Sequence, residues 1–234
     1  MPERRFLETI EEILSPEHTV FVIIDMQNDF CSAEGGFAVR GADVAACSAL
    51  GDRIADLLRQ VRDLEVPRMF IVNRPLSSFG EESSVQRRFN RRLSPRGEDW
   101  SYTVEGSWGA EIIPALSPRV DEPVIKKRRS SAFWGTHLDM YLRAHGFRTV
   151  VLCGVTTEGC VESTARDAMF NEYHVVIVSD AVASLSREQH DAAMILMRRR
   201  FDVLRGDEVV GIWRKASSRR RRVAPRGREA DCRS

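Results

Sequence analysis

The fold is decided by the stretch Val150-Val-Leu-Cys-Gly-Val-Thr-Thr-Glu-Gly-Cys160. Its first half is apolar and rich in β-branched residues, which is typical of a strand buried on both faces. The chain turns through Gly154 and continues into an amphipathic segment at 161–171. This order predicts a strand, a turn and a helix that begins near Cys160. A thiol at that position lies at the positive end of the helix dipole, where it is suited to act as a nucleophile.

The same alternation of strand-like and helix-like segments extends over most of the chain. Apolar runs predict six strands, and segments of helical period separate them. Such an alternation indicates an α/β fold, here a Rossmann-like three-layer α/β/α sandwich with a mostly parallel six-stranded sheet. Residues 74–111 show no sustained period, and we interpret them as an irregular insertion of the kind that often carries sites. The predicted strands are 19–25, 68–73, 123–127, 149–153, 174–180 and 201–204, and the predicted helices are 43–64, 136–145, the segment after Gly159, and 186–200.

Length and composition favour one domain with a basic extension. The 234 residues are 43% hydrophobic and contain no long linker, so we expect a single domain over 15–216. Residues 217–234 are rich in arginine and poor in apolar side chains, which predicts a disordered tail. The formal net charge of +1 gives no bias toward nucleic acid or acidic membranes, and we expect neither as a partner.

Cysteine usage and the N-terminal segment indicate a cytoplasmic protein. The chain has five cysteines, an odd number without a Cys-x-x-Cys pair, which favours free thiols in a reducing compartment. The N-terminal segment has no apolar core of a signal peptide, and no window approaches the length of a membrane-spanning helix. The histidines lack the spacing of metal ligands, so we expect no metal and no cofactor.

Three reactive side chains follow predicted strands at the edge of the sheet where ligands bind in such folds. Cys160 would attack a carbonyl carbon, and Asp25 would accept the thiol proton and pass it to a leaving amine. Lys127 would lower the pKa of the thiol and hold Asp25 in place. The backbone N–H groups of Thr156 and Cys160 would form the oxyanion hole. This arrangement predicts hydrolysis of a small molecule.

Three motifs resemble the isochorismatase-like cysteine hydrolase superfamily. They are Val22-Ile-Ile-Asp-Met-Gln-Asn-Asp-Phe30, Lys127-Arg-Arg-Ser-Ser-Ala-Phe-Trp-Gly-Thr-His-Leu-Asp139 and Val151-Leu-Cys-Gly-Val-Thr-Thr-Glu-Gly-Cys-Val-Glu-Ser-Thr-Ala-Arg-Asp-Ala168. The resemblance implies an Asp-Lys-Cys triad, here Asp25, Lys127 and Cys160, and a non-proline cis peptide bond at Val155–Thr156. The family places its lysine six positions before the phenylalanine of the second motif, which selects Lys127 rather than Lys126. Strand alternation separates these two lysines as well.

Within the superfamily, the motifs are most similar to ureidoacrylate and biuret-type amidohydrolases. Nicotinamidases bind a metal through an Asp-x-His element after the second strand, where this chain has Asn73-Arg-Pro-Leu. The resemblance therefore implies a metal-independent enzyme that cleaves a C–N bond of a small carboxamide or ureido compound through a thioester. Ser130 replaces a tyrosine of the ureidoacrylate enzymes. Two alternatives stay open, an isochorismatase-type vinyl-ether hydrolase and a non-catalytic binding protein.

The resemblance also guides the expected substrate contacts and assembly. Phe30 is expected to wall the pocket, Asn73 to hydrogen-bond an amide or ureido group, and Trp134 to lie at the entrance. Arg74 and Arg129 could contact a substrate carboxylate. Relatives form dimers or tetramers, which implies a homo-oligomer here.

Overall fold

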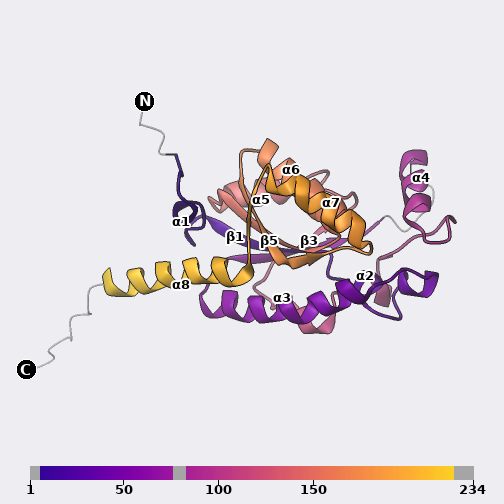
Figure 1. Ribbon diagram of the computed structural model, residues 1–234, viewed down its shortest axis with the longest axis horizontal. Helices are drawn as coiled ribbons and strands as arrows, with labels where there is room; N and C mark the ends of the chain where they lie inside the picture. The colour runs from indigo at the N-terminus through magenta and orange to yellow at the C-terminus, as the bar shows by residue number, and fades with distance from the viewer. Residues whose placement is uncertain (1–5, 76–82, 224–234) are drawn as a thin grey trace, which may run out of the picture.

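The protein folds around one parallel sheet of six strands, seen in the computed structural model of residues 6–75 and 83–223 (Figure 1). Side chains 220–223 are outside the description. The strand order is β3-β2-β1-β4-β5-β6, and every neighbouring pair is parallel. This topology confirms the predicted α/β sandwich. The strands are β1 (Thr19–Ile24), β2 (Arg68–Asn73), β3 (Val124–Lys127), β4 (Thr149–Val155), β5 (His174–Ala183) and β6 (Asp202–Leu204).

Helices cover both faces of the sheet (Figure 1). One layer contains α3 (Ala45–Asp63) and α8 (Gly206–Val223), and the other contains α5 (Leu138–Ala144), α6 (Glu162–Phe170) and α7 (Arg187–Arg198). Strand alternation divides the core in the same way, because Phe21 and Ile23 pack on the α3 side while Val20 and Val22 pack on the α6 side. The short elements are α1 (Ile10–Ile13), α2 (Asn28–Cys31), η1 (Ala38–Arg40), η2 (Trp108–Ala110) and η3 (Pro114–Leu116).

The structure differs from the sequence-based expectation in two segments. The stretch 74–111 contains the helix α4 (Ser84–Leu93), which stands apart from the two helical layers in Figure 1. The helix α8 continues to Val223, so the first part of the segment expected to be disordered is helical. Arginine is a good helix former, and Trp213, which is fully buried, anchors this helix to the core. Residues 224–234 lie outside the described residues. No helix in the described part of the chain is long and apolar enough to span a membrane.

The strand order places a crevice between β1 and β4. From β1 the chain builds β2 and β3 on one side, and it then returns to place β4 on the other side. In open parallel sheets this reversal creates a binding crevice at the carboxyl ends of the two strands. Gly154 lets β4 approach β1 here, since its φ is +116° and an added Cβ would lie 2.0 Å from the carbonyl oxygen of Ile24. A side chain at this position would push the two strands apart.

Candidate active site

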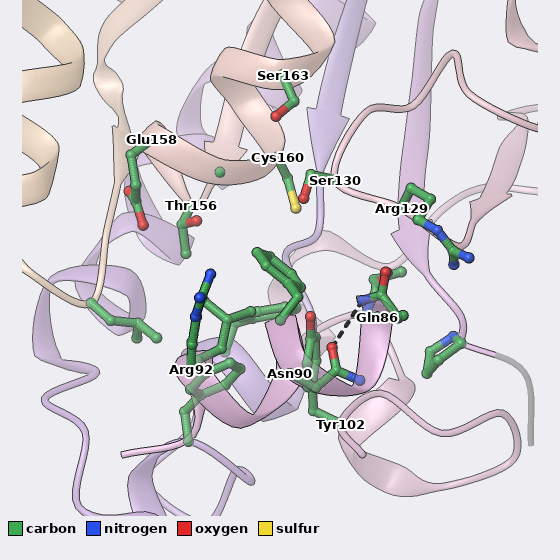
Figure 2. A pocket seen from close by; sticks show the side chains of 18 of the residues that line it. Gln86, Asn90, Arg92, Tyr102, Arg129, Ser130, Thr156, Glu158, Cys160 and Ser163 are labelled. Atoms are coloured by element: carbon green, nitrogen blue, oxygen red, sulfur yellow. Dashed lines mark hydrogen bonds between the residues drawn. The ribbon is translucent and has the colours of Figure 1, made fainter. Parts of the chain in front are cut away.

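A cavity of about 480 Å³ opens at the carboxyl edge of the sheet. Its floor is formed by residues that follow β1, β2, β3 and β4, and α4 forms the opposite wall. Figure 2 shows Cys160 pointing into this space from one side while Gln86, Asn90 and Arg92 face it from α4. The cavity therefore brings the region of the predicted nucleophile together with a helix that the sequence did not indicate.

Asp25, Lys127 and Cys160 meet at the cavity floor, where Lys127 and Cys160 line the cavity and Asp25 is buried beside Lys127. The Nζ of Lys127 lies 2.8 Å from Oδ2 of Asp25 and 3.1 Å from Sγ of Cys160. It also donates a hydrogen bond to the carbonyl oxygen of Arg129 at 3.1 Å. The ammonium group is therefore held between a carboxylate, a thiol and a backbone carbonyl.

Strand geometry explains why Lys127 and not Lys126 occupies this place. The side chains of β3 alternate between exposed and buried, so that Lys126 faces solvent and Lys127 is fully buried. Lys126 instead forms a surface ion pair with Glu105. Adjacent lysines on a strand are thereby assigned to opposite faces.

The end of β1 turns sharply at Asp25. Its φ of +52° lies in the left-handed region, which aspartate tolerates better than most residues. Its backbone N–H still donates to Ile71 O on β2 at 2.9 Å, and its own carbonyl accepts from the N–H of Gln27 at 2.7 Å. The turn directs the carboxylate toward Lys127, and the Asp25 side chain has no exposed surface.

Burial and charge act on the triad in opposite directions. Burial opposes the charged form of Lys127, but the negative charge of Asp25 and the nearby Cys160 outweigh it and raise the pKa of the ammonium. Burial, reinforced by the charge of Asp25, raises the pKa of the Cys160 thiol to about 12. Lys127 lowers this pKa as expected, but it does not overcome the other two effects. The raised pKa favours the neutral thiol, which agrees with the expectation that Asp25 accepts a proton from Cys160.

Cys160 lies in a tight helical turn rather than at the first residue of a regular helix. The turn η4 (Thr157–Val161) has π-helical hydrogen bonding and leads directly into α6. The peptide bond between Val155 and Thr156 is cis. Thr156 and Cys160, the two expected oxyanion donors, both line the cavity. The turn thus presents its backbone and its thiol to the same space.

Asn73 lies at the end of β2 and lines the cavity, but its side chain already has a protein partner. Its Nδ2 donates to Oγ1 of Thr103 at 2.8 Å. Gln27, which sequence reasoning did not single out, bridges this strand end to the following loop. Its Oε1 accepts from the Asn73 N–H at 2.8 Å, and its Nε2 donates to the carbonyl oxygens of Asn73 at 3.0 Å and Ala110 at 2.7 Å. A fully buried glutamine therefore fixes the position of Asn73.

The expected aromatic contacts separate into two groups. Phe30 lines the cavity and packs against Phe37 and Tyr102, which also line it. Trp134 is 64% exposed and does not belong to the cavity wall. The guanidinium of Arg129 lies 5.6 Å from its ring centroid instead. Within a single chain, Trp134 therefore does not line the cavity, but it contacts Arg129, which does.

Sequence reasoning missed the cavity residues contributed by α4. Ser83 caps this helix by accepting a hydrogen bond from Gln86 N at 3.2 Å, and Gln86 donates in turn to Asn90 Oδ1 at 2.9 Å. The apolar residues Val85, Phe89 and Leu93 recur every four positions, which is a helical signal. Six arginines or other polar residues between them obscured this signal. Glu158, Ser163, Ser186 and Gln189 also line the cavity without having been predicted to do so.

A family model for the isochorismatase domain matches residues 19–208 of this chain. The chain belongs to the isochorismatase family. The matched segment includes Asp25, Lys127, Cys160 and the whole sheet. Because the match covers most of the chain, the family relationship applies to the fold that holds the cavity.

Relatives of the isochorismatase family are similar in sequence and in structure. A ureidoacrylate amidohydrolase of Acinetobacter baylyi is 30% identical over 192 residues, which covers 77% of each chain. The structure of an isochorismatase-like hydrolase from Alkaliphilus metalliredigens is 30% identical with a TM-score of 0.71, over 83% of this chain and 98% of the other. A cysteine hydrolase from Pseudomonas syringae is 25% identical with a TM-score of 0.73, over 86% of this chain and 94% of the other.

Proposed function

We propose that the protein is a metal-independent cysteine hydrolase that cleaves a C–N bond of a small carboxamide or ureido compound. The observation that carries this proposal is the position of the Lys127 ammonium, within 3.1 Å of both the Asp25 carboxylate and the Cys160 sulfur. The similarity to a ureidoacrylate amidohydrolase supports the choice of an amide or ureido bond. The similarity to a cysteine hydrolase supports the choice of the nucleophile.

The first half-reaction begins from the neutral thiol. As Sγ of Cys160 bonds to the carbonyl carbon of the substrate, the thiol proton moves to the Asp25 carboxylate. The electron pair of the carbonyl bond moves onto oxygen, where the N–H groups of Thr156 and Cys160 would stabilise the negative charge. Collapse of this intermediate breaks the C–N bond, and Asp25 returns the proton to the leaving nitrogen.

The second half-reaction releases the acyl group. Water attacks the thioester carbonyl and gives a proton to Asp25, the C–S bond breaks, and the departing sulfur takes that proton. The products are an amine or ammonia and a carboxylic or carbamic acid, and the enzyme returns to its initial state. Lys127 compensates the charge of Asp25 whenever Asp25 is ionised. It also stabilises the sulfur whenever it carries negative charge.

The residues after β2 support a reaction that does not pass through a metal. A metal site of the nicotinamidase kind would need an Asp-x-His element there, and the chain has Asn73-Arg-Pro-Leu. The side chain of Asn73 is held by Thr103, and the described residues contain no group of three or more His, Cys, Asp or Glu side chains arranged to hold a metal ion. The donor set present does not fit such a site.

We further propose a cytoplasmic homo-oligomer. Free, fully or almost fully buried thiols at Cys31, Cys47 and Cys153 fit a reducing compartment. Large apolar side chains are exposed on the helical layer of α5, α6 and α7, where Met140 is 69% exposed and Phe170 and Ile195 are each 67% exposed. Exposed apolar side chains of this size are frequent where proteins bind one another. Light scattering coupled to size-exclusion chromatography measures the state directly.

The proposal is tested by ammonia release from biuret, ureidoacrylate, carbamoyl amino acids and aromatic carboxamides. We expect turnover of at least one of them by the wild-type protein, no turnover by Cys160→Ala, and unchanged turnover after treatment with a chelator. Cys47→Ala is the matched control, since Cys47 is buried in α3 and does not line the cavity. Intact-mass measurement should detect an acyl adduct on the wild-type chain. Full activity of Cys160→Ala, or action on isochorismate alone, would refute the proposal.

A further inference from the structure

Glu158 places a carboxylate in the wall of the cavity that nothing in the mechanism uses. It lies two residues before Cys160 in the turn η4 and lines the same space. Its Oε2 is buried, and no hydrogen-bond donor in the described part of the chain contacts it. An acceptor that is removed from water without a donor costs free energy, and more so when the group is charged. A ligand in the cavity can supply the missing donor.

Three other carboxylates that are largely withdrawn from solvent have cationic partners. Asp25 is paired with Lys127, Glu122 with two arginines, and Glu162 with Arg166. Glu158 differs because it has no cationic partner and lines a space large enough for a substrate. None of the positively charged side chains that line this space contacts Oε2.

The charges around Cys160 are distributed unevenly. In Figure 2, Glu158 and Thr156 lie on one side of Cys160, and Ser130 and Arg129 lie on the other. A substrate whose carbonyl carbon faces Sγ would therefore extend one arm toward a carboxylate and the other toward a guanidinium. The two arms meet opposite electrostatic environments.

We infer that Glu158 accepts hydrogen bonds from a nitrogen donor of the substrate, so that the site selects ureido compounds with a second amino or amide nitrogen beside the cleaved bond. This inference rests on the proposed function. A terminal –NH₂ group offers two donors to a carboxylate that offers only acceptors, and an ionised acceptor makes the stronger hydrogen bond. A methyl group at this place gives the Glu158 carboxylate no donor. A substrate carboxylate at this place is repelled and must lie toward Arg129.

Glu158 also lies in the first turn of η4, where a carboxylate stabilises a helix through its dipole. This structural contribution does not depend on the substrate. It predicts that a variant loses stability and loses activity toward all substrates in equal proportion. A role in selection predicts instead that the ratio between two substrates changes.

The test compares biuret with N-acetylurea, in which a methyl group replaces one terminal amino group of biuret. Both release ammonia when the carbamoyl carbon is attacked. For Glu158→Gln we expect kcat/KM to fall about tenfold or more for biuret and less than about threefold for N-acetylurea. Glu162→Gln is the matched control, because Glu162 pairs with Arg166 and does not line the cavity. Glu162→Gln should leave the ratio of kcat/KM for biuret to kcat/KM for N-acetylurea unchanged.

An unchanged ratio in Glu158→Gln, with or without a lower denaturation midpoint, would overturn the inference. If the wild-type protein hydrolyses neither compound, the proposed function loses support while the inference stays testable by binding. Ligand-observed NMR on the Cys160→Ala protein should then show tighter binding of biuret than of N-acetylurea, and Glu158→Gln in that background should remove the difference. Equal binding of the two compounds would contradict the inference independently.

Discussion

Asp25 and Lys127 form an ion pair in which neither side chain has any exposed surface, with 2.8 Å between Oδ2 and Nζ. Removing two charges from water is costly, and their mutual attraction only offsets that cost when both are present. Loss of either partner leaves the other as an uncompensated buried charge. The pair is therefore a stability element as well as part of the proposed chemistry.

Replacing Lys127 should damage stability and activity together. For Lys127→Met we expect the free energy of unfolding to fall by about 3 kcal/mol, because Asp25 stays buried without its partner, and ammonia release to be lost. Lys126→Met is the matched control, since that lysine pairs with Glu105 on the surface. It should cost at most about 1 kcal/mol and keep turnover. Urea denaturation and ammonia release measure the two effects, and equal losses in both variants would contradict this assignment.

The pH dependence of thiol alkylation should report the raised pKa of Cys160. Because this pKa is about 12, the thiolate fraction in the wild-type protein should keep increasing with pH beyond 9. Asp25 contributes to the raised pKa, so Asp25→Asn should move the alkylation profile to lower pH while it abolishes hydrolysis. Mass spectrometry of the peptide that contains Cys160, after timed iodoacetamide treatment, gives the rates. A wild-type profile that levels off near pH 9 would contradict the prediction.

Acid stability should depend on Glu122, which lies in the loop before β3 and pairs with Arg62 and Arg68. Burial opposes its ionisation, but hydrogen bonds from Arg62, Arg68 and the Arg119 backbone outweigh it and lower its pKa to about 2. A lowered pKa stabilises the fold above the unfolded value near 4.5, and this contribution is lost as the pH falls toward 2. Glu122→Gln should therefore cost about 3 kcal/mol at pH 7, with a smaller difference from wild type below pH 4. The exposed Glu34→Gln should show no such pH dependence in denaturation at pH 3, 4 and 7.

Gln27 should affect both the fold and the binding of substrate. Gln27→Ala leaves the Asn73 N–H without its buried partner and removes one of the donors to the carbonyl oxygens of Asn73 and Ala110, which Arg74 also contacts, so the free energy of unfolding should fall by about 2 kcal/mol. The end of β2 is then less constrained, so KM should rise more than kcat falls. Gln60→Ala, whose hydrogen bonds are exposed, should change stability by less than about 1 kcal/mol. An unchanged KM in Gln27→Ala would show that Asn73 is held by Thr103 alone.

The sequence predicted the sheet well because its strands are buried on both faces. The apolar runs before Asp25 and Gly154 are continuous. A short continuous apolar run is typical of a strand in a parallel sheet that is covered on both faces. The carboxyl ends of these strands meet at one edge by topology, which is why Asp25, Lys127 and Cys160 could be proposed as one site before any coordinates existed. Their distances then follow from the register of neighbouring strands.

The missed residues depend on contacts between segments that are distant in sequence. Gln27 bonds to Asn73 and Ala110, 46 and 83 residues away, and a polar residue after a strand gives no local sign of such partners. The extent to which burial raises the pKa of the Cys160 thiol could not be predicted either, because burial depends on what covers the site and not on the turn itself. Trp134 was placed at the entrance from motif position alone, whereas its ring lies against Arg129 and solvent.

Among the described residues, polar contacts attach the helix α4 to the segment that follows it. Arg87 and Arg91 pair with Asp99, and Trp100 donates to the carbonyl oxygen of Asn90 at 3.1 Å. The reactive groups lie on the opposite wall, on strands whose positions are fixed by the sheet. Changes in the α4 segment can therefore alter which molecules fit while the bond-breaking groups stay in register. Descendants of one hydrolase could acquire new substrates through this helix without rebuilding their chemistry.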